Sequence, residues 1–170
     1  NDDYLMKRDT ENADLFWLEI DGLEAGKEYI YQYLVEGNVR IGDPYGRKVA
    51  DPWNDEFIPD AVYPDLISFT NQDYGVATTF QTGQTPFVWD ESESSWQRPD
   101  KQDLVIYELL IRDFIGSHSY QDLIDSIGYL KNLGVNAIEL MPIMEFEGNI
   151  SWGYNPSYFF AVDKYYGTEN

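Results

Sequence analysis

The stretch that decides the fold reads LVIYELLI at residues 104–111, SYQDLIDSIGYLKNL at 119–133 and VNAIELMPIM at 135–144. The first and third pieces are apolar runs, and the second has the periodicity of an amphipathic helix. A strand, a helix and a second strand in this order predict a βαβ unit with parallel strands. Ligands usually bind at loops that leave the carboxyl ends of such strands. Here that loop, residues 152–168, is rich in aromatic side chains.

The predicted helix has recognisable ends. Ser119 is a favourable N-cap residue, and Asp122 lies three positions later, as in a capping box. Gly134 can take the left-handed conformation that ends a helix. The continuously apolar run 104–111 predicts a strand that is buried on both faces. The stripe expected to be buried on the helix contains Leu123, Ile124, Ile127, Leu130 and Leu133.

Ahead of this unit, residues 15–89 predict an all-β region. The expected strands cover residues 15–20, 29–35, about 62–69 and 86–89. In the second of them, one face carries Tyr29, Tyr31, Tyr33 and Val35. Gly37-Asn38 is a two-residue hairpin signal, and the segment 43–54, rich in Pro, Gly and Asp, is expected to be irregular. The pattern is typical of a β-sandwich.

The polar stretch 90–103 (DESESSWQRPDKQD) separates these regions and is predicted to be a linker. A closed (β/α)8 barrel needs roughly 200 or more residues, so the region 104–170 cannot complete one. Either its two strands join a small sheet, or the chain is a piece of something longer. The absence of an initial Met and the start at Asn1 favour the piece.

The composition excludes several classes of partner and site. The formal net charge of −20, from 31 acidic and 11 basic residues, argues against nucleic acid or an anionic membrane as a partner. The 14 Tyr and 5 Trp offer flat faces with a polar rim, which suit sugar rings, although most aromatic residues belong to cores. There is no cysteine, hence neither a disulfide framework nor a thiolate metal site. The chain carries no signal peptide and no long apolar run, so we expect no membrane insertion.

Cellular location is less constrained by the sequence. An absence of cysteine fits an exported bacterial protein without proving export. We therefore favour a secreted, periplasmic or cell-surface bacterial protein over a cytoplasmic one.

Three residues near the strand ends could carry chemistry. The single histidine, His118, lies between the first strand and the helix, and we interpret it as a loop residue rather than a base. Asp113 and Glu145 lie near the carboxyl ends of the strands, where active sites are built. Their spacing alone gives neither of them a role.

Two further carboxylates, Glu108 and Glu139, lie inside the apolar strands. A buried carboxylate must be paired or must line a polar cavity. Arg112 is the expected partner of one of them, so we interpret the pair as structural.

The aromatic loop is more informative. Gly153 permits a tight turn before Tyr154, and Asn155-Pro156 makes the exit rigid. A tyrosine presented in this way can lay its ring against a sugar face. For Phe159 and Phe160 we expect packing beneath the loop instead.

The runs VIYELLIRDF and YLKNLGVNAIELMPIMEFEGNISWGYNPSYFFAVDKYYGT resemble the opening of the catalytic barrel of the α-amylase superfamily, glycoside hydrolase family 13. The earlier FWLEIDGL, GKEYIYQYLVEG and DPYG resemble the immunoglobulin-like N-terminal module of branching enzymes and pullulanases (carbohydrate-binding family 48 or isoamylase N-domain type). The resemblance implies an α+β multi-domain chain. Its parts are a partial immunoglobulin-like β-sandwich (1–89), a linker (90–103) and the first βαβ unit of an incomplete TIM (β/α)8 barrel (104–170).

The resemblance also implies an N-terminal fragment of a retaining α-glucan hydrolase of carbohydrate metabolism, with an Asp nucleophile and a Glu acid/base. In the family both stand on later barrel strands, so we expect no catalytic residue in this chain and no activity from the chain alone. Tyr154 matches the tyrosine that stacks on the sugar in subsite −1, and Trp152 is the second predicted substrate-binding residue. Leu110 stands where many relatives carry His.

The implied partner is an α-glucan polysaccharide or oligosaccharide. No cofactor or metal is expected in this chain, whereas the full-length enzyme could bind calcium. Two alternatives stay open: a carbohydrate-binding module only, or an α-glucan transferase such as a branching enzyme. A barrel-derived subunit of an amino-acid transporter is disfavoured, because a β-module rather than a transmembrane helix precedes the barrel.

Overall fold

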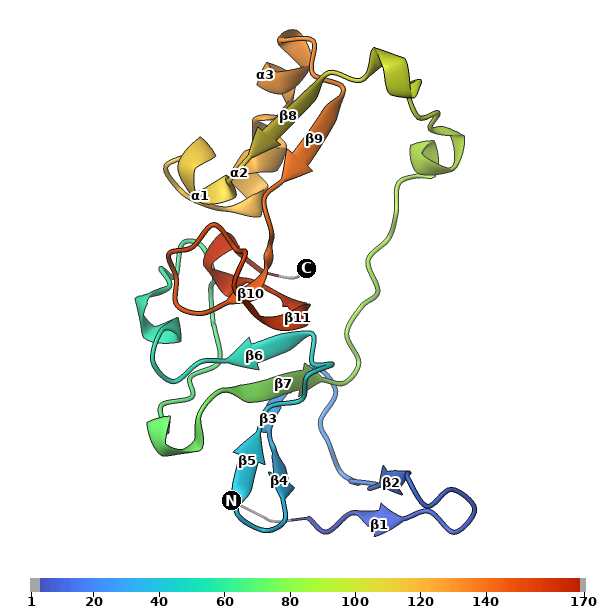
Figure 1. Ribbon diagram of the computed structural model, residues 1–170, viewed down its shortest axis with the longest axis vertical. Coiled ribbons are helices and arrows are strands. Elements are labelled where there is room, and N and C mark those ends of the chain that lie inside the picture. Colours follow the sequence, from blue (N-terminus) through green and yellow to red (C-terminus); the bar gives the residue numbers. More distant parts are fainter. Residues whose placement is uncertain (1–3, 169–170) are drawn as a thin grey trace.

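The computed structural model describes residues 4–168, which form small β-sheets and a few short helices (Figure 1). The strands are β1 (Lys7–Arg8), β2 (Phe16–Trp17), β3 (Glu28–Tyr31), β4 (Tyr33–Val35), β5 (Val39–Ile41), β6 (Lys48–Ala50), β7 (Ala77–Gln81), β8 (Ile106–Leu109), β9 (Ala137–Leu140), β10 (Met144–Phe146) and β11 (Pro156–Val162). The helices are α1 (Ile111–Phe114), α2 (Tyr120–Asp125) and α3 (Ile127–Asn132). None of the helices in the described part has the length and apolarity to cross a membrane.

The N-terminal sheets are antiparallel. β7 is the central strand of a three-stranded sheet, with β3 on one side and β6 on the other, while β1 pairs with β2 and β4 with β5. Val49, Ala50 and Ala77 are fully buried in the central sheet. Tyr29 of β3 stacks on Phe80 of β7, with 5.6 Å between the ring centroids. Burial of these apolar groups stabilises the sheet.

The structure corrects the strand expected over residues 29–35, which is split at Gln32. The Gln32 side-chain amide donates to the carbonyl oxygens of Tyr74 (2.6 Å) and Val76 (3.0 Å). The chain thus leaves the β3–β7 pairing and enters a separate hairpin with β5. Its turn is centred on Glu36 and Gly37, whose φ angles are 53° and 77°, one residue earlier than predicted.

Other predictions for the β region were also wrong. No strand forms over residues 62–69: the chain turns up to Asp65, where the Val62 amide donates to the Pro59 carbonyl (2.8 Å), and is irregular beyond it. Residues 86–89 are exposed and have no strand partner in the part of the chain described. The strand expected over 15–20 shortens to the two residues of β2, and the segment expected to be irregular contains β6.

The predicted βαβ unit is confirmed. β8 and β9 are parallel, with Ile106 opposite Ala137 and Leu109 opposite Leu140, and the helices lie between them in the chain. The helical stretch is interrupted at Ser126, whose hydroxyl donates to the Asp122 carbonyl (2.8 Å). Such side-chain bonding to the preceding turn competes with a regular helix.

Both predicted helix ends are confirmed. The Ser119 side chain accepts a hydrogen bond from the Asp122 amide (3.1 Å). Gly134 has φ 86°, and the Val135 amide donates to the Leu130 carbonyl (3.1 Å), the pattern of a Schellman motif.

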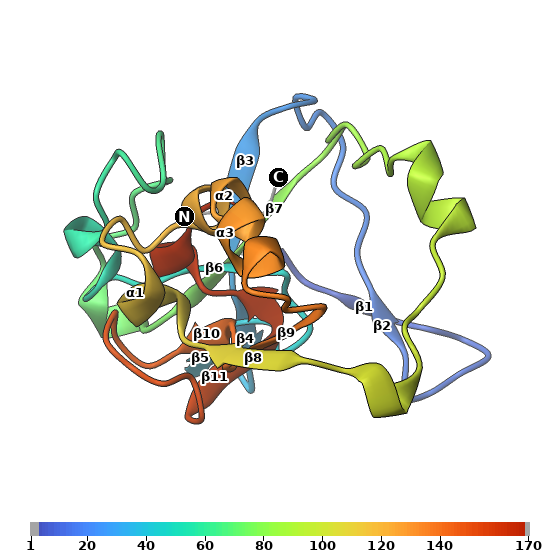
Figure 2. The same ribbon diagram turned by 90° about the horizontal axis from the view of Figure 1, so that it is seen from above.

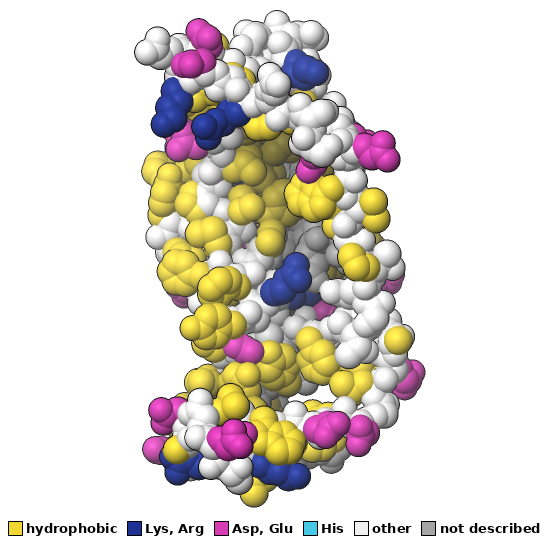
Figure 3. All heavy atoms as spheres, turned by 90° about the vertical axis from the view of Figure 1, so that its right-hand side faces the viewer, with side chains coloured by type: hydrophobic (Ala, Val, Ile, Leu, Met, Phe, Trp, Pro, Cys, Tyr) yellow, Lys and Arg dark blue, Asp and Glu magenta, His cyan; other side chains and the backbone are white. Residues whose placement is uncertain are grey.

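Burial in the βαβ unit is lower than predicted. Leu123 and Leu130 are buried, but Ile124, Ile127 and Leu133 are exposed. Ile106 of β8 is 55% exposed, so this strand is not covered on both faces. The reason is that β8 and β9 form a sheet of only two strands within the described residues. Figure 3 shows hydrophobic side chains spread over the middle of the molecule, between charged groups at its two ends.

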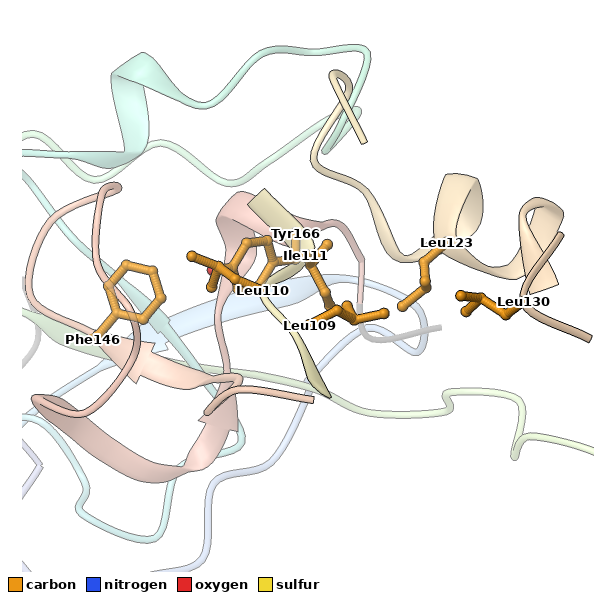
Figure 4. Packing of buried hydrophobic residues seen from close by; sticks show 7 residues of the cluster. All are labelled: Leu109, Leu110, Ile111, Leu123, Leu130, Phe146 and Tyr166. Carbon is orange, nitrogen blue, oxygen red and sulfur yellow. The ribbon is translucent and has the colours of Figure 1, made fainter. Parts of the chain in front are cut away.

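One hydrophobic core joins the βαβ unit to the C-terminal hairpin. It runs from the helices through the end of β8 to β10 and the turn after β11 (Figure 4). Its buried members are Leu109, Leu110, Ile111, Leu123, Leu130, Phe146 and Tyr166. Leu110 is therefore a core residue.

The hairpin of β10 and β11 lies where a long aromatic loop was predicted. Its pairing is antiparallel but irregular, with Glu145 opposite Tyr158. It packs beside β6, so the C-terminal residues lie against the N-terminal sheet (Figure 1). Residues 90–103 instead run along the outside, with two short 3₁₀ turns at Glu91–Ser95 and Lys101–Asp103 (Figures 1 and 2).

Candidate functional site

The candidate site is the loop between β10 and β11, which carries Trp152 and Tyr154. Their side chains are 64% and 66% exposed. Most of each side chain is therefore accessible to a ligand. Their role in binding substrate stays a prediction, while their exposure meets its first requirement.

The position of this loop is fixed by a glycine. Gly153 has φ 85°, and a Cβ atom there would lie 2.2 Å from the carbonyl oxygen of Pro142. A side chain would therefore overlap the backbone that follows β9. Only glycine allows the loop to approach the end of this strand so closely.

Polar contacts hold the same loop to the end of β8. Arg112, three residues after that strand, donates from Nη1 to the Ser151 carbonyl (3.4 Å). The Ser151 hydroxyl accepts from the Gly153 amide (2.9 Å) and contacts the Asn155 side chain. The loop thus lies at the carboxyl ends of both parallel strands, the edge where the sequence placed it.

The two phenylalanines of β11 differ from the prediction. Phe159 and Phe160 are exposed rather than packed under the loop. The irregular pairing of β11 turns Tyr158 and Ala161 inward and leaves the residues between them outside. Phe160 stacks on exposed Tyr45, with 5.3 Å between the ring centroids.

The carboxylates of the parallel strands are not buried. Glu108 and Glu139 are exposed and lie opposite each other in register. Neither needs a buried partner, and the expected pairing with Arg112 is wrong. Arg112 binds its neighbour Asp113 instead, with Nε 2.7 Å from Oδ1 and Nη2 3.1 Å from Oδ2. This bond lowers the pKa of Asp113.

His118 is a loop residue, as predicted. It has φ 62°, its Nδ1 lies 3.0 Å from the Arg112 carbonyl oxygen, and its ring stacks on Tyr165. An open hollow of about 430 Å³ lies nearby, between β8, α1 and α3. Its one charged lining residue, Asp113, is already bound to Arg112, so the hollow offers no free catalytic group.

A buried charge cluster lies beneath the hairpin, and the sequence did not predict it. The Lys164 ammonium contacts Glu145 Oε1 and lies 3.3 Å from Asp55 Oδ1. All three side chains are almost inaccessible to solvent. Asp163, also buried, accepts from the backbone amides of Phe146 (3.1 Å) and Tyr165 (2.9 Å). The cluster joins the segment after β6 to the C-terminal hairpin.

Burial dominates the electrostatics of this cluster. Burial raises the pKa of Glu145 to about 7, although the charge of Lys164 opposes the shift. The pKa of Asp163 rises to about 6 for the same reason, against the opposing effect of its backbone hydrogen bonds. Burial would lower the pKa of Lys164, but Glu145 and Asp55 raise it above its ordinary value. Lys164 therefore stays charged.

We expect Glu145 to make folding stability depend on pH. A raised folded pKa means that the folded chain binds the proton more tightly than the unfolded chain, whose Glu145 titrates near the ordinary value of 4.5. The free energy of unfolding should therefore fall as pH rises from about 4.5 to about 7. Asp163 acts in the same direction over a window that ends at about 6.

Urea unfolding of wild type and Glu145→Gln across this range measures the effect. The variant cannot titrate at this position, so its stability should depend less steeply on pH. The same slope in both proteins would contradict the assignment to Glu145.

The described residues contain no group of three or more His, Asp or Glu side chains that could hold a metal ion.

Several known proteins are similar to this chain in sequence. No protein-family model matches the chain. Malto-oligosyltrehalose trehalohydrolase of Saccharolobus solfataricus is 32% identical over 166 residues, which cover 96% of this chain and 24% of that protein. Isoamylase 3, chloroplastic, of Oryza sativa is 30% identical over 192 aligned positions, covering 90% of this chain and 24% of its own length.

A solved structure is similar to this chain in fold. The putative α-amylase from Salmonella typhimurium matches with a TM-score of 0.67 and 22% identity, covering 96% of this chain and 23% of that one. Over nearly its whole length the chain is homologous to part of proteins that are members of the α-amylase superfamily, as its motifs indicated. It spans about a quarter of the length of the curated relatives it matches.

Proposed function

We propose that the whole protein is a retaining glycosidase of the α-amylase type, which hydrolyses the α-glucosidic bonds of starch-like or glycogen-like glucans. One observation carries the proposal: Trp152 and Tyr154 are held exposed at the carboxyl ends of a parallel strand pair. The names of the two relatives, a malto-oligosyltrehalose trehalohydrolase and an isoamylase, favour an α-glucan as the ligand of that surface.

The proposed architecture has three parts. Residues 1–89 belong to an immunoglobulin-like module, residues 90–103 form a linker, and residues 104–170 begin a (β/α)8 barrel. Antiparallel pairing up to β7, the exposed linker and the parallel pair β8–β9 support this division. The uncovered apolar side chains of β8 and β9, Ile106 and Ile138 among them, fit strands that gain neighbours in a larger sheet.

In the proposed mechanism this chain orients the sugar. The Tyr154 ring lies flat against one face of the sugar, Trp152 offers a second aromatic surface, and Arg112 with Gly153 keeps the loop in place. Residues beyond Asn170 supply the nucleophilic Asp and the acid/base Glu, close together as double displacement requires. Catalysis thus depends on a sugar ring that is positioned before the bond breaks.

The stereochemistry of the product tests the proposal. Full-length protein acting on a malto-oligosaccharide should release a sugar that initially keeps the α-configuration, which proton NMR detects directly. An initial β-anomer would contradict a retaining mechanism. Chain transfer without new reducing ends would favour the transferase alternative, and binding without turnover would favour the binding module.

Substitution of Tyr154 tests the loop. In the full-length enzyme, Tyr154→Ala should lower kcat/KM on a malto-oligosaccharide by the equivalent of about 1–3 kcal/mol, because the flat contact is lost. Tyr154→Phe keeps the ring and should retain most of the activity. If a folded Tyr154→Ala enzyme matched wild type, Tyr154 would have no part in substrate binding.

A further inference from the structure

The loop that carries Trp152 and Tyr154 is closed by one hydroxyl group. The Ser151 hydroxyl accepts a hydrogen bond from the Gly153 amide (2.9 Å) and donates one to the side-chain oxygen of Asn155. A serine hydroxyl that bonds the backbone two residues later is typical of tight turns. These two hydrogen bonds, the Ser151 clasp, therefore join the residue before Tyr154 to the residue after it.

The clasp restrains the backbone around Tyr154 from both sides. Gly153 is buried and has φ 85°, whereas the Tyr154 side chain is 66% exposed. The exposed ring thus projects from a backbone that is held in place. Ordering a loop when a ligand binds costs conformational entropy. A loop that is already ordered avoids most of this cost.

The attachment of the loop to the strand ends does not depend on the Ser151 hydroxyl. Arg112 donates to the backbone carbonyl of Ser151 (3.4 Å), and its guanidinium is held by Asp113. The close approach of Gly153 to Pro142 is likewise a backbone contact. Replacing the Ser151 side chain with alanine therefore removes the clasp and leaves the attachment to β8 and β9 in place.

We propose that Ser151 is a positioning residue, whose hydroxyl orients the Tyr154 ring before a sugar binds. The inference rests on the proposed function, because it takes the Tyr154 ring as a contact of an α-glucan. Ser151 itself does not touch the substrate. Its effect on activity passes through Tyr154, so it should not exceed the effect of removing that ring.

Hydrogen–deuterium exchange of the full-length protein tests the clasp without substrate. In the part of the chain that the structure describes, the Ser151 hydroxyl is the one hydrogen-bond acceptor of the Gly153 amide. A peptide that spans residues 151–156 should therefore exchange faster in Ser151→Ala than in wild type. Ser151→Thr keeps a hydroxyl at this position and should exchange as slowly as wild type.

Ser157→Ala is the matched control for this measurement. Ser157 is exposed in β11, and its hydroxyl forms no hydrogen bond within residues 4–168. The same serine-to-alanine change at this position should leave the exchange of residues 151–156 unaltered.

A double-mutant cycle tests whether the clasp acts through Tyr154. In the full-length enzyme, Ser151→Ala should lower kcat/KM on a malto-oligosaccharide by roughly three- to tenfold, and Ser151→Thr should recover most of the loss. In a Tyr154→Ala background, Ser151→Ala should cost less than about twofold, since no ring is left to orient. A merely structural role of Ser151 would give the same fold loss in both backgrounds.

Each result decides one part of the inference. Equal exchange in wild type and Ser151→Ala would reject the clasp. Equal fold losses with and without the Tyr154 ring, or a Tyr154→Ala enzyme as active as wild type, would reject the positioning role. Wild-type protein without glycosidase activity would contradict the proposed function, while the exchange result would still decide the clasp. Undiminished turnover in Ser151→Ala would leave the glycosidase intact and reject only the role of Ser151.

Discussion

Replacing Lys164 with methionine is expected to lower the free energy of unfolding by about 3–5 kcal/mol. Methionine has a similar length but no charge, so Glu145 and Asp55 would be left facing each other without a cation in a site that excludes water. Removing one partner of a buried ion pair costs more than the pair itself contributes, because the remaining charge stays desolvated. Urea unfolding at neutral pH measures the loss.

Two further variants make this test specific. Lys27→Met removes an exposed lysine that pairs with Glu24 at 3.2 Å, and its stability should stay close to that of wild type. Adding Glu145→Gln and Asp55→Asn to Lys164→Met removes the unpaired charges and should restore part of the stability. A loss that persists in full in the triple variant would point to packing rather than charge.

Gly153→Ala should lower the free energy of unfolding by about 1–3 kcal/mol. The new methyl group would overlap the Pro142 carbonyl oxygen, and φ 85° is unfavourable for alanine. The loop must therefore move away from the end of β9, and it carries Tyr154 with it. In the full-length enzyme, kcat/KM on a malto-oligosaccharide should fall together with stability.

Gly128→Ala is the matched control. Gly128 lies in α3, and a Cβ atom there would meet nothing within 4 Å. Alanine favours a helix over glycine by up to about 1 kcal/mol, so this variant should be as stable as wild type or more stable. Thermal unfolding of both variants gives the comparison. A neutral Gly153→Ala would show that the loop does not depend on this close approach.

Local signals in the sequence predicted the βαβ unit well. The N-cap at Ser119, the helix end at Gly134 and the two apolar runs each depend on neighbours within a few residues. Their physical causes are therefore visible in a short window. Burial of the strands was overestimated, since it depends on which other strands lie beside them.

The central strand β7 shows what the sequence could not reveal. Its residues Thr78 and Thr79 are polar, yet both are buried. Thr78 accepts from the Asp43 amide (2.7 Å), and Thr79 donates to Glu28 (2.6 Å). Asp43 and Glu28 lie far from β7 in the sequence. Nothing in the neighbouring residues therefore indicates that these two polar threonines are buried.

The exposed loop and the buried charge cluster also differ in how well the sequence predicts them. The exposed loop could be predicted, because Gly153, Tyr154 and the following Asn-Pro pair form a local motif. The buried cluster could not, since Asp55, Glu145 and Lys164 meet only after the hairpin packs on the N-terminal sheet. Its one local signal is a charged Asp163-Lys164 pair inside an otherwise aromatic and apolar run.

The hairpin packs directly against the N-terminal sheet, so residues 90–103 need not hold the two parts apart as a rigid spacer. The hairpin meets the N-terminal part through the ion pair of Lys164 with Asp55, the hydrogen bond from the Asn149 side chain to the Asn54 carbonyl (2.8 Å) and the stacking of Tyr45 on Phe160. These contacts, rather than the linker, set the angle between the two parts. In the proposed division of the chain, residues 90–103 act as a tether that raises the effective concentration of one part around the other. We therefore expect substitutions in residues 90–103 to be tolerated better than substitutions of Asp55, Lys164 or Asn149.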